Sequence, residues 1–309
     1  MKRFVGLLAA TSLLGLAGCG STDTSGSGST SGGRLPVTAS FYPLEWATEQ
    51  IGGDHVAVSS LTPPGAEPHD LELTPKQVGE LNDAALVVYA SGFQPAVDDA
   101  VSTAAPTTGF DVAPDADLTI AATGEEAEPS ASIDNAVMDP HFWLDPVRFE
   151  AVALAIRDRL VSADPTNAAD YGAAADRLVA ELTALDEEYR TGLADCAQTY
   201  LVTSHTAFAY LAQRYGLQQE GISGVNPDVE PSAATLRQIT ELVREKGITT
   251  IYTETLASPA LADTVARETG ATTAVLDPVA GLTDTSAGSD YLEVMRSNLA
   301  TLEEGQQCR

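Results

Sequence analysis

Short apolar runs of strand length alternate along the chain with segments whose apolar residues recur every three or four positions. The runs predict strands at residues 35–40, 56–61, 86–90, 200–203, 218–222, 248–253 and 272–276. The three-to-four spacing predicts helices at residues 43–51, from 75 onward, and at 207–215, 232–246, 260–269 and 291–304. This alternation is typical of α/β layers built around a mostly parallel sheet.

One helical segment is much longer than the others and divides the alternating pattern into two halves. It opens at Asp164-Pro165 and keeps an apolar stripe as far as Tyr189. A helix over residues 165–190 is ~39 Å long, so we predict two similar α/β lobes joined by one long, rigid helix as their only connector. Ligands of open α/β sheets bind beyond the carboxyl ends of the strands, which places a site in the cleft between the lobes. The predicted bounds are 35–163 for the first lobe, 164–194 for the connector and 195–309 for the second lobe.

The N-terminus has the pattern of an export signal. Lys2 and Arg3 precede an apolar run that is too short to span a bilayer and ends at Leu16-Ala17-Gly18-Cys19, which resembles a bacterial lipobox. Cleavage before Cys19 would leave a lipidated cysteine; an ordinary secretory signal is the alternative. Ser, Thr and Gly fill almost all of the next segment, which predicts a flexible tether to the outer face of the cell membrane. The predicted bounds are 1–18 for the signal peptide and 19–34 for the lipidated cysteine and tether.

Charge and cysteine content agree with export. The formal net charge of −28 disfavours nucleic acid as a partner and favours a cationic or neutral ligand. If Cys19 carries lipid, Cys196 and Cys308 remain of the three cysteines. An even pair in an oxidising compartment indicates one disulfide, and two buried free thiols are the alternative.

Three of the four histidines stand at the ends of predicted strands or in the loops that follow them. His69 lies in a proline-rich loop, His141 lies in the segment DPHFWLDP, and His205 follows an apolar strand. Asp277 follows another strand and precedes a proline, whereas His55 falls at the opposite edge and is expected on the surface. Taken singly, each residue also fits a turn, core or helix-cap role. Together, three imidazoles and a carboxylate suit tetrahedral Zn²⁺ better than Mn²⁺, which prefers more oxygen ligands.

Four segments carry a resemblance to a known family: GAEPHDLELTP, HFWLDP, TSHTAFAYLAQRYGL and LDPVAGL. In this order after a lipobox, they resemble the cluster A-I solute-binding proteins of zinc and manganese ABC transporters, over nearly the whole mature chain. The resemblance implies two α/β lobes joined by a long backbone helix. It also implies a monomeric, non-enzymatic carrier that delivers its metal to the permease of an ABC importer. The metal ligands that it implies are His69, His141, His205 and Asp277. Histidine at the third of these positions supports Zn²⁺, with Mn²⁺ as the alternative.

The resemblance has departures and leaves auxiliary roles open. Many zinc members carry a histidine-rich loop before the second ligand, but residues 123–136 here contain acidic residues and no histidine. This stretch is either a weak cation collector or a solvated acidic loop. Glu67 is a candidate extra ligand. Glu254 is a candidate acceptor that orients a ligand histidine, or else a surface residue at a helix start.

Two other classes of function remain as alternatives. A zinc hydrolase also uses three protein ligands, but Asp277 would close the open coordination position, and the chain has no HExxH motif. A surface adhesin with a structural metal fits the lipid and tether, and it would unfold when the metal is removed. The chain has no phosphate-binding Gly-Lys-Ser/Thr loop, so it is not the ATPase of a transporter.

Overall fold

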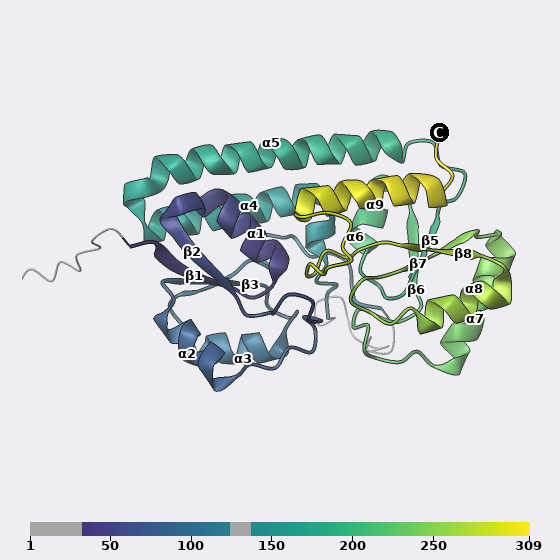
Figure 1. The fold of residues 1–309 in the computed structure, drawn as a ribbon, viewed down its shortest axis with the longest axis horizontal. Coiled ribbons are helices and arrows are strands. Elements are labelled where there is room, and N and C mark those ends of the chain that lie inside the picture. Colours follow the sequence, from purple (N-terminus) through teal and green to yellow (C-terminus); the bar gives the residue numbers. More distant parts are fainter. Residues whose placement is uncertain (1–32, 124–136) are drawn as a thin grey trace, which may run out of the picture. The chain divides into compact units, whose positions relative to one another are not determined.

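The computed structural model describes residues 33–123 and 137–309, and within these ranges the strands form two four-stranded parallel sheets (Figure 1). The strand order is β2-β1-β3-β4 in the first sheet and β6-β5-β7-β8 in the second. Neighbouring strands within the two sheets are parallel, so the predicted class of two α/β lobes is confirmed. The strands are β1 (Leu35–Ala39), β2 (Val56–Ser60), β3 (Leu86–Tyr89), β4 (Gly109–Asp111), β5 (Tyr200–Thr203), β6 (Gln218–Gly221), β7 (Thr250–Thr253) and β8 (Thr272–Val275).

Helices cover both faces of the first sheet. Figure 1 shows α1 and α4 on one face and α2 and α3 on the other. A capping box between Thr74 and Gln77 starts α2. The strand β4 and the helices α3 and α4 were not predicted, although the apolar residues of α4 recur at helical spacing from Phe149 to Leu160. The helices of this lobe are α1 (Tyr42–Gly52), α2 (Pro75–Asp83), α3 (Pro95–Ala104) and α4 (Pro146–Ala163).

The predicted long helix is present as α5 (Ala168–Gly192), and a 3-10 turn over Pro165–Asn167 precedes it. Its 25 residues make it about 38 Å long. It is the long helix that connects the two lobes along the chain, as predicted. The C-terminal helix α9 (Tyr291–Gly305) runs beside α5 (Figure 1), and the Tyr189 hydroxyl of α5 donates to the Met295 carbonyl of α9.

Helices also cover both faces of the second sheet, with α7 and α8 together on one face. Three of these helices end at glycines in the left-handed region, Gly216, Gly247 and Gly270, where other residues are strained. The predicted ends at Gly247 and Gly270 are therefore confirmed. The helices are α6 (Ala209–Tyr215), α7 (Ala233–Lys246) and α8 (Ala260–Thr269).

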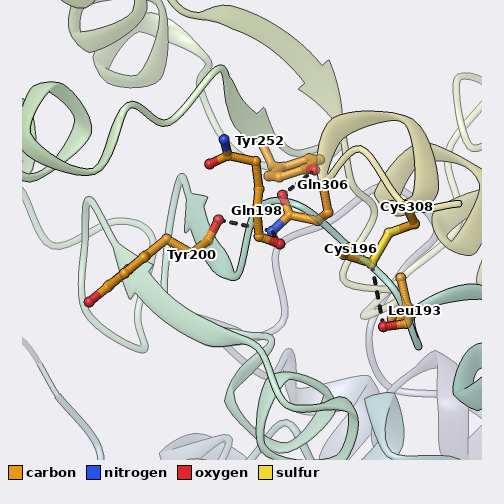
Figure 2. The surroundings of a disulfide bond; sticks show 7 residues. All are labelled: Leu193, Cys196, Gln198, Tyr200, Tyr252, Gln306 and Cys308. Atoms are coloured by element: carbon orange, nitrogen blue, oxygen red, sulfur yellow. Dashed lines mark hydrogen bonds between the residues drawn. A yellow bond between two sulfur atoms is a disulfide. The ribbon is translucent and has the colours of Figure 1, made fainter.

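A disulfide joins Cys196 to Cys308, as one of the two cysteine readings predicts, and the free-thiol alternative is wrong (Figure 2). It fastens the C-terminal tail to the segment that precedes β5. Beside it, the buried Gln306 side chain accepts a hydrogen bond from the Tyr252 hydroxyl and donates one to the Tyr200 carbonyl. The tail after α9 is therefore held by covalent and polar contacts.

Several predictions fall on residues outside the described ranges. These are the signal peptide, the lipidated Cys19, all but the last residues of the tether, and all but the first residue of the acidic stretch 123–136. Within the described ranges, no helix has the length and apolar character that crossing a membrane requires. The residue bounds predicted for the lobes and the connector stay predictions.

Candidate metal centre

Three histidines from distant parts of the sequence converge on one point. His69 lies in the loop after β2, His141 lies just before the 3-10 turn Phe142–Leu144, and His205 follows β5. The Nε2 atom of His141 is 3.2 Å from Nε2 of His69 and 3.4 Å from Nε2 of His205. Two nitrogens bound tetrahedrally to Zn²⁺ at 2.0–2.1 Å are about 3.3 Å apart. The pairs His69–His141 and His141–His205 therefore already have the spacing of zinc ligands.

Carboxylates occupy the other ring nitrogen of two of these histidines. Nδ1 of His141 is 2.8 Å from Oδ1 of Asp139, and Nδ1 of His205 is 2.5 Å from Oε2 of Glu254. A carboxylate acceptor keeps the proton on Nδ1 and leaves the lone pair of Nε2 exposed. The Nε2 atoms of His141 and His205 face each other at 3.4 Å, and when both rings are neutral with the proton on Nδ1, their lone pairs can bind a cation between them. Glu254 lies beside His205 and is 7% exposed, so it is not a surface residue, and its orienting role stays a prediction.

Burial sets most of the charge states around the three histidines. It lowers the pKa of His69 and His141, and the neighbouring histidines lower it further. Burial also lowers the pKa of His205, but the Glu254 carboxylate outweighs it, so the net direction is upward. The pKa of Asp139 is raised to about 7, again by burial. The centre therefore favours neutral imidazoles at His69 and His141, which is the form that binds metal.

Asp277 lies at the end of the strand β8, as predicted, but its carboxylate is not part of the close three-histidine group. Its Oδ1 accepts from the Val279 amide at 2.8 Å, and its Oδ2 accepts from the Ser286 hydroxyl at 2.9 Å. The Asn298 side chain of α9 bonds both the amide and the carbonyl of Asp277. Burial raises the pKa of the Asp277 carboxyl. Hydrogen bonds thus hold both the backbone and the carboxylate of Asp277.

Glu67 lies beside the cluster rather than in it. Its Oε1 accepts from the backbone amide of His69 at 3.0 Å. Burial raises its pKa to about 7, opposed by that hydrogen bond and by the charge of His205. Glu67 therefore stabilises the loop that carries His69, and it is close enough to the cluster to interact with His205. The fourth histidine, His55, lies at the other end of β2, away from the cluster, as predicted. It pairs with Asp170.

Sequence reasoning missed several residues that hold the cluster in place. Asp139 is one, and its position two residues before a candidate ligand was the only signal available. Phe93 packs its ring edge-on against His69, with ring centroids 4.6 Å apart. The Trp143 indole donates to the Pro278 carbonyl at 2.8 Å, which links the His141 segment to the Asp277 segment of the other lobe. The Trp143–Pro278 contact has no signal in the sequence, because its two residues are 135 positions apart.

Comparisons with known proteins identify the family. Residues 37–305 match the family model described as ZnuA, zinc-uptake complex component A, periplasmic. The chain belongs to this family. The zinc uptake protein ZnuA of Bacillus subtilis is 36% identical over 98% of both chains. The zinc-binding lipoprotein AdcA of Streptococcus pneumoniae is 36% identical over 98% of this chain, which spans 61% of AdcA.

Solved structures of other members share the fold. The laminin-binding protein Lmb of Streptococcus agalactiae, described as an adhesin with metal-transporting activity, has a TM-score of 0.77 and 32% identity. That match covers 88% of this chain and 99% of Lmb. The Zn(II)-bound ZnuA-like domain of S. pneumoniae AdcA has a TM-score of 0.73 and 36% identity, over 89% of this chain and 99% of the domain.

Membership of this family assigns the broad role of the protein. The family consists of the solute-binding components of zinc transporters, so the chain is the extracytoplasmic binding component of an ABC importer and not an enzyme. The hydrolase alternative is therefore wrong. A family of uptake components does not favour the adhesin alternative either.

Proposed function

We propose that this protein captures one Zn²⁺ through Nε2 of His69, His141 and His205, with Asp277 as the fourth ligand, and delivers it to the permease of its importer. The observation that carries this proposal is the spacing of the three Nε2 atoms, 3.2 and 3.4 Å between neighbours, with two Nδ1 atoms held by carboxylates. Glu67 serves as an auxiliary residue that steadies His69 and can contribute an oxygen. Glu254 orients His205.

The donor set favours Zn²⁺ over Mn²⁺. Imidazole nitrogens suit Zn²⁺, whereas Mn²⁺ is better served by a majority of oxygen ligands. Both relatives cited above are named for zinc, which supports the same choice. Mn²⁺ is the alternative cargo, and a direct comparison of the two affinities separates them.

Asp277 completes the site by a small movement in this proposal. Because Asn298 holds its backbone, the carboxylate moves toward the three nitrogens by a change in side-chain torsion that breaks its hydrogen bonds to Val279 and Ser286. The first lobe then supplies His69 and His141, and the second supplies His205 and Asp277. A site divided equally between two lobes responds to their relative position, which suits a carrier that must both hold and release its cargo.

The proposed location of the protein and its attachment to the membrane follow from its N-terminal sequence. Residues 1–18 are removed as a signal peptide, Cys19 carries the lipid, and residues 19–34 form the tether to the outer face of the cell membrane. The protein then collects Zn²⁺ near its permease as a monomer. Its lobes are residues 35–163 and 195–309, and its connector is residues 164–194. A lipobox-like segment followed by a Ser/Thr/Gly stretch supports this arrangement.

Metal titration of the full chain after chelation tests the proposal, with circular dichroism recorded on the same samples. We expect one tight equivalent of Zn²⁺, a folded chelated form, and loss of tight binding in His141→Ala. The matched control is His55→Ala, because His55 lies away from the cluster and pairs with Asp170. Tighter binding of Mn²⁺ than of Zn²⁺ would show that Zn²⁺ is not the cargo. Absence of divalent-metal binding, or unfolding on chelation, would overturn the carrier function.

A further inference from the structure

The loop that carries His69 has little regular backbone structure to hold it. Residues 61–74 contain no helix or strand. Three of these residues are prolines, which have no N–H to donate, so the loop can form few backbone hydrogen bonds of its own. The site nevertheless needs Nε2 of His69 at 3.2 Å from Nε2 of His141. Productive geometry of a binding site generally has to be kept within about 0.5 Å.

The Gln94 side chain bridges two points of this loop. Gln94 precedes α3 and is 1% exposed. Its Nε2 donates to Oγ1 of Thr62 at 3.0 Å and to the carbonyl of Pro68 at 3.1 Å. Pro68 is the residue immediately before His69. A single amide group therefore ties the start of the loop to the peptide unit that leads into the ligand.

The bridge is anchored on the sheet. Thr62 uses its own hydroxyl to donate to the Ser40 carbonyl, at 2.7 Å, just beyond the carboxyl end of β1. The residue before Gln94 is Phe93, whose ring packs edge-on against the His69 ring. Two consecutive residues of the β3–α3 loop thus contact the His69 segment, one at its backbone and one at its ring.

We propose that Gln94 is a positioning residue for zinc binding, and that its two hydrogen bonds hold the His69 loop where Nε2 meets the other two histidines. This inference rests on the proposed role of His69 as a ligand. Gln94 does not touch the metal. Its effect passes through Pro68 to His69, so its loss increases the spread of His69 positions and speeds the departure of the metal.

Gln94→Met tests the proposal, because methionine has a similar length and volume but donates no hydrogen bond. The matched control is Gln77→Met, since Gln77 also donates its amide to a backbone carbonyl of this loop, that of Leu61 at 2.7 Å, but makes no such bond to the residue before His69. The full chain of each variant is titrated with Zn²⁺ against a chromophoric chelator. Co²⁺ is then bound and its visible spectrum recorded, and urea unfolding of the chelated protein reports stability.

For Gln94→Met we expect Zn²⁺ affinity to fall about ten- to a hundred-fold, the range typical of lost outer-shell partners, and the Co²⁺ spectrum to change. Gln77→Met is expected to lower stability while keeping the wild-type affinity and spectrum. Wild-type affinity and spectrum in Gln94→Met would overturn the proposal, as would an equal loss in both variants. If Gln94→Met does not fold, Thr62→Val removes one acceptor of the bridge and is expected to shift both readouts in the same direction.

The same measurements separate this inference from the proposed function. If wild type and His69→Ala bind Zn²⁺ equally, His69 is not a ligand and the proposed site is wrong. If His69→Ala loses Zn²⁺ while Gln94→Met keeps it, the site stands and only the role of Gln94 is overturned.

Discussion

His141 and His205 each present Nε2 to the cluster because a carboxylate occupies Nδ1, but the two carboxylates use their oxygens differently. Asp139 accepts from both the amide and Nδ1 of His141 with the same atom, Oδ1. Glu254 accepts from the His205 amide with Oε1 and faces Nδ1 with Oε2. An amide has one accepting oxygen, so it can replace Asp139 but not Glu254.

We therefore predict that Glu254→Gln weakens Zn²⁺ binding about ten- to a hundred-fold. The new NH₂ group faces Nδ1 of His205 and drives the ring proton to Nε2, which removes the lone pair that binds metal. Asp139→Asn, as the matched variant, keeps its acceptor oxygen and is expected to stay close to wild-type affinity. Competition titration with a chelator measures both. Equal losses in the two variants would contradict this account of the tautomers.

At the residue scale the sequence indicated the three histidines but not most of their supports. The histidines stood out because few occur in the chain and three follow strands. Glu254 was a candidate because it follows the apolar run 248–253. Gln94 and Phe93 had no signal, since a glutamine or phenylalanine before a helix has many structural roles and only the fold brings them to His69.

At the scale of the elements, a buried carboxylate holds the joint between α5 and α6. Asp186 of α5 is 6% exposed and receives a two-point contact from Arg214 of α6, at 2.5 and 2.8 Å. Arg190 and the Tyr215 hydroxyl also donate to it. Burial by itself raises the pKa of Asp186, but these hydrogen bonds outweigh burial and lower it to about 2.

The lowered pKa predicts a pH-dependent contribution to stability. Since the folded value lies below the ordinary 3.8, Asp186 stabilises the fold above that pH, and its contribution is lost as the pH falls toward 2. We expect Asp186→Asn to lower the free energy of unfolding by about 2 kcal/mol at pH 7 and by progressively less below pH ~4. Urea unfolding at pH 7 and pH 3 measures the difference.

The control for this prediction is Asp176→Asn, an exposed position on the same helix, which is expected to have little effect at either pH. A deficit in Asp186→Asn that is equally large at both pH values would show that packing, rather than the carboxylate charge, holds the joint.

Sequence patterns predicted the helices and strands better than they predicted contacts between individual residues. Seven strands and the long helix were found because apolar spacing and turn residues act locally. The short strand β4 was missed since three residues carry no periodicity. The 3-10 turn at Pro165–Asn167 shifted the start of α5, because a proline at the first turn fits either kind of helix.

At the scale of the whole molecule, the C-terminal helix α9 and the disulfide attach the end of the chain to earlier parts of the fold. The residues of α9 pack into the apolar cluster that also contains residues of the first lobe. The buried Tyr291 ring stacks on Trp46, with ring centroids 4.8 Å apart. The disulfide then fixes the end of this helix at a sequence separation of 112 residues (Figure 2).

A cross-link over so long a loop predicts a large effect on stability. Replacing both cysteines by serine is expected to lower the free energy of unfolding by about 2–5 kcal/mol, because the unfolded chain gains freedom. Zn²⁺ affinity is expected to stay unchanged, since Cys196 precedes β5 and His205 follows its opposite end. Thermal unfolding and metal titration of the double variant provide the two measurements.

Reduced wild type supplies the control, because it keeps both cysteines and loses only the bond. It is expected to unfold at the same temperature as the double serine variant. A variant that lost Zn²⁺ affinity together with stability would instead mean that the C-terminal fastening reaches the metal centre.

The sequence by itself determined the alternation of strands and helices, the division into two α/β lobes, the cysteine pair and the three histidines, because each depends on local spacing or on scarce residue types. Only the tertiary structure decided that α9 packs beside α5 and that Asp139, Gln94 and Phe93 support the histidines. It also placed the Asp277 carboxylate on Ser286 and Val279 rather than within the histidine group. The geometry of these contacts, including those between residues close in sequence, comes from how the loops, the two sheets and their helices pack.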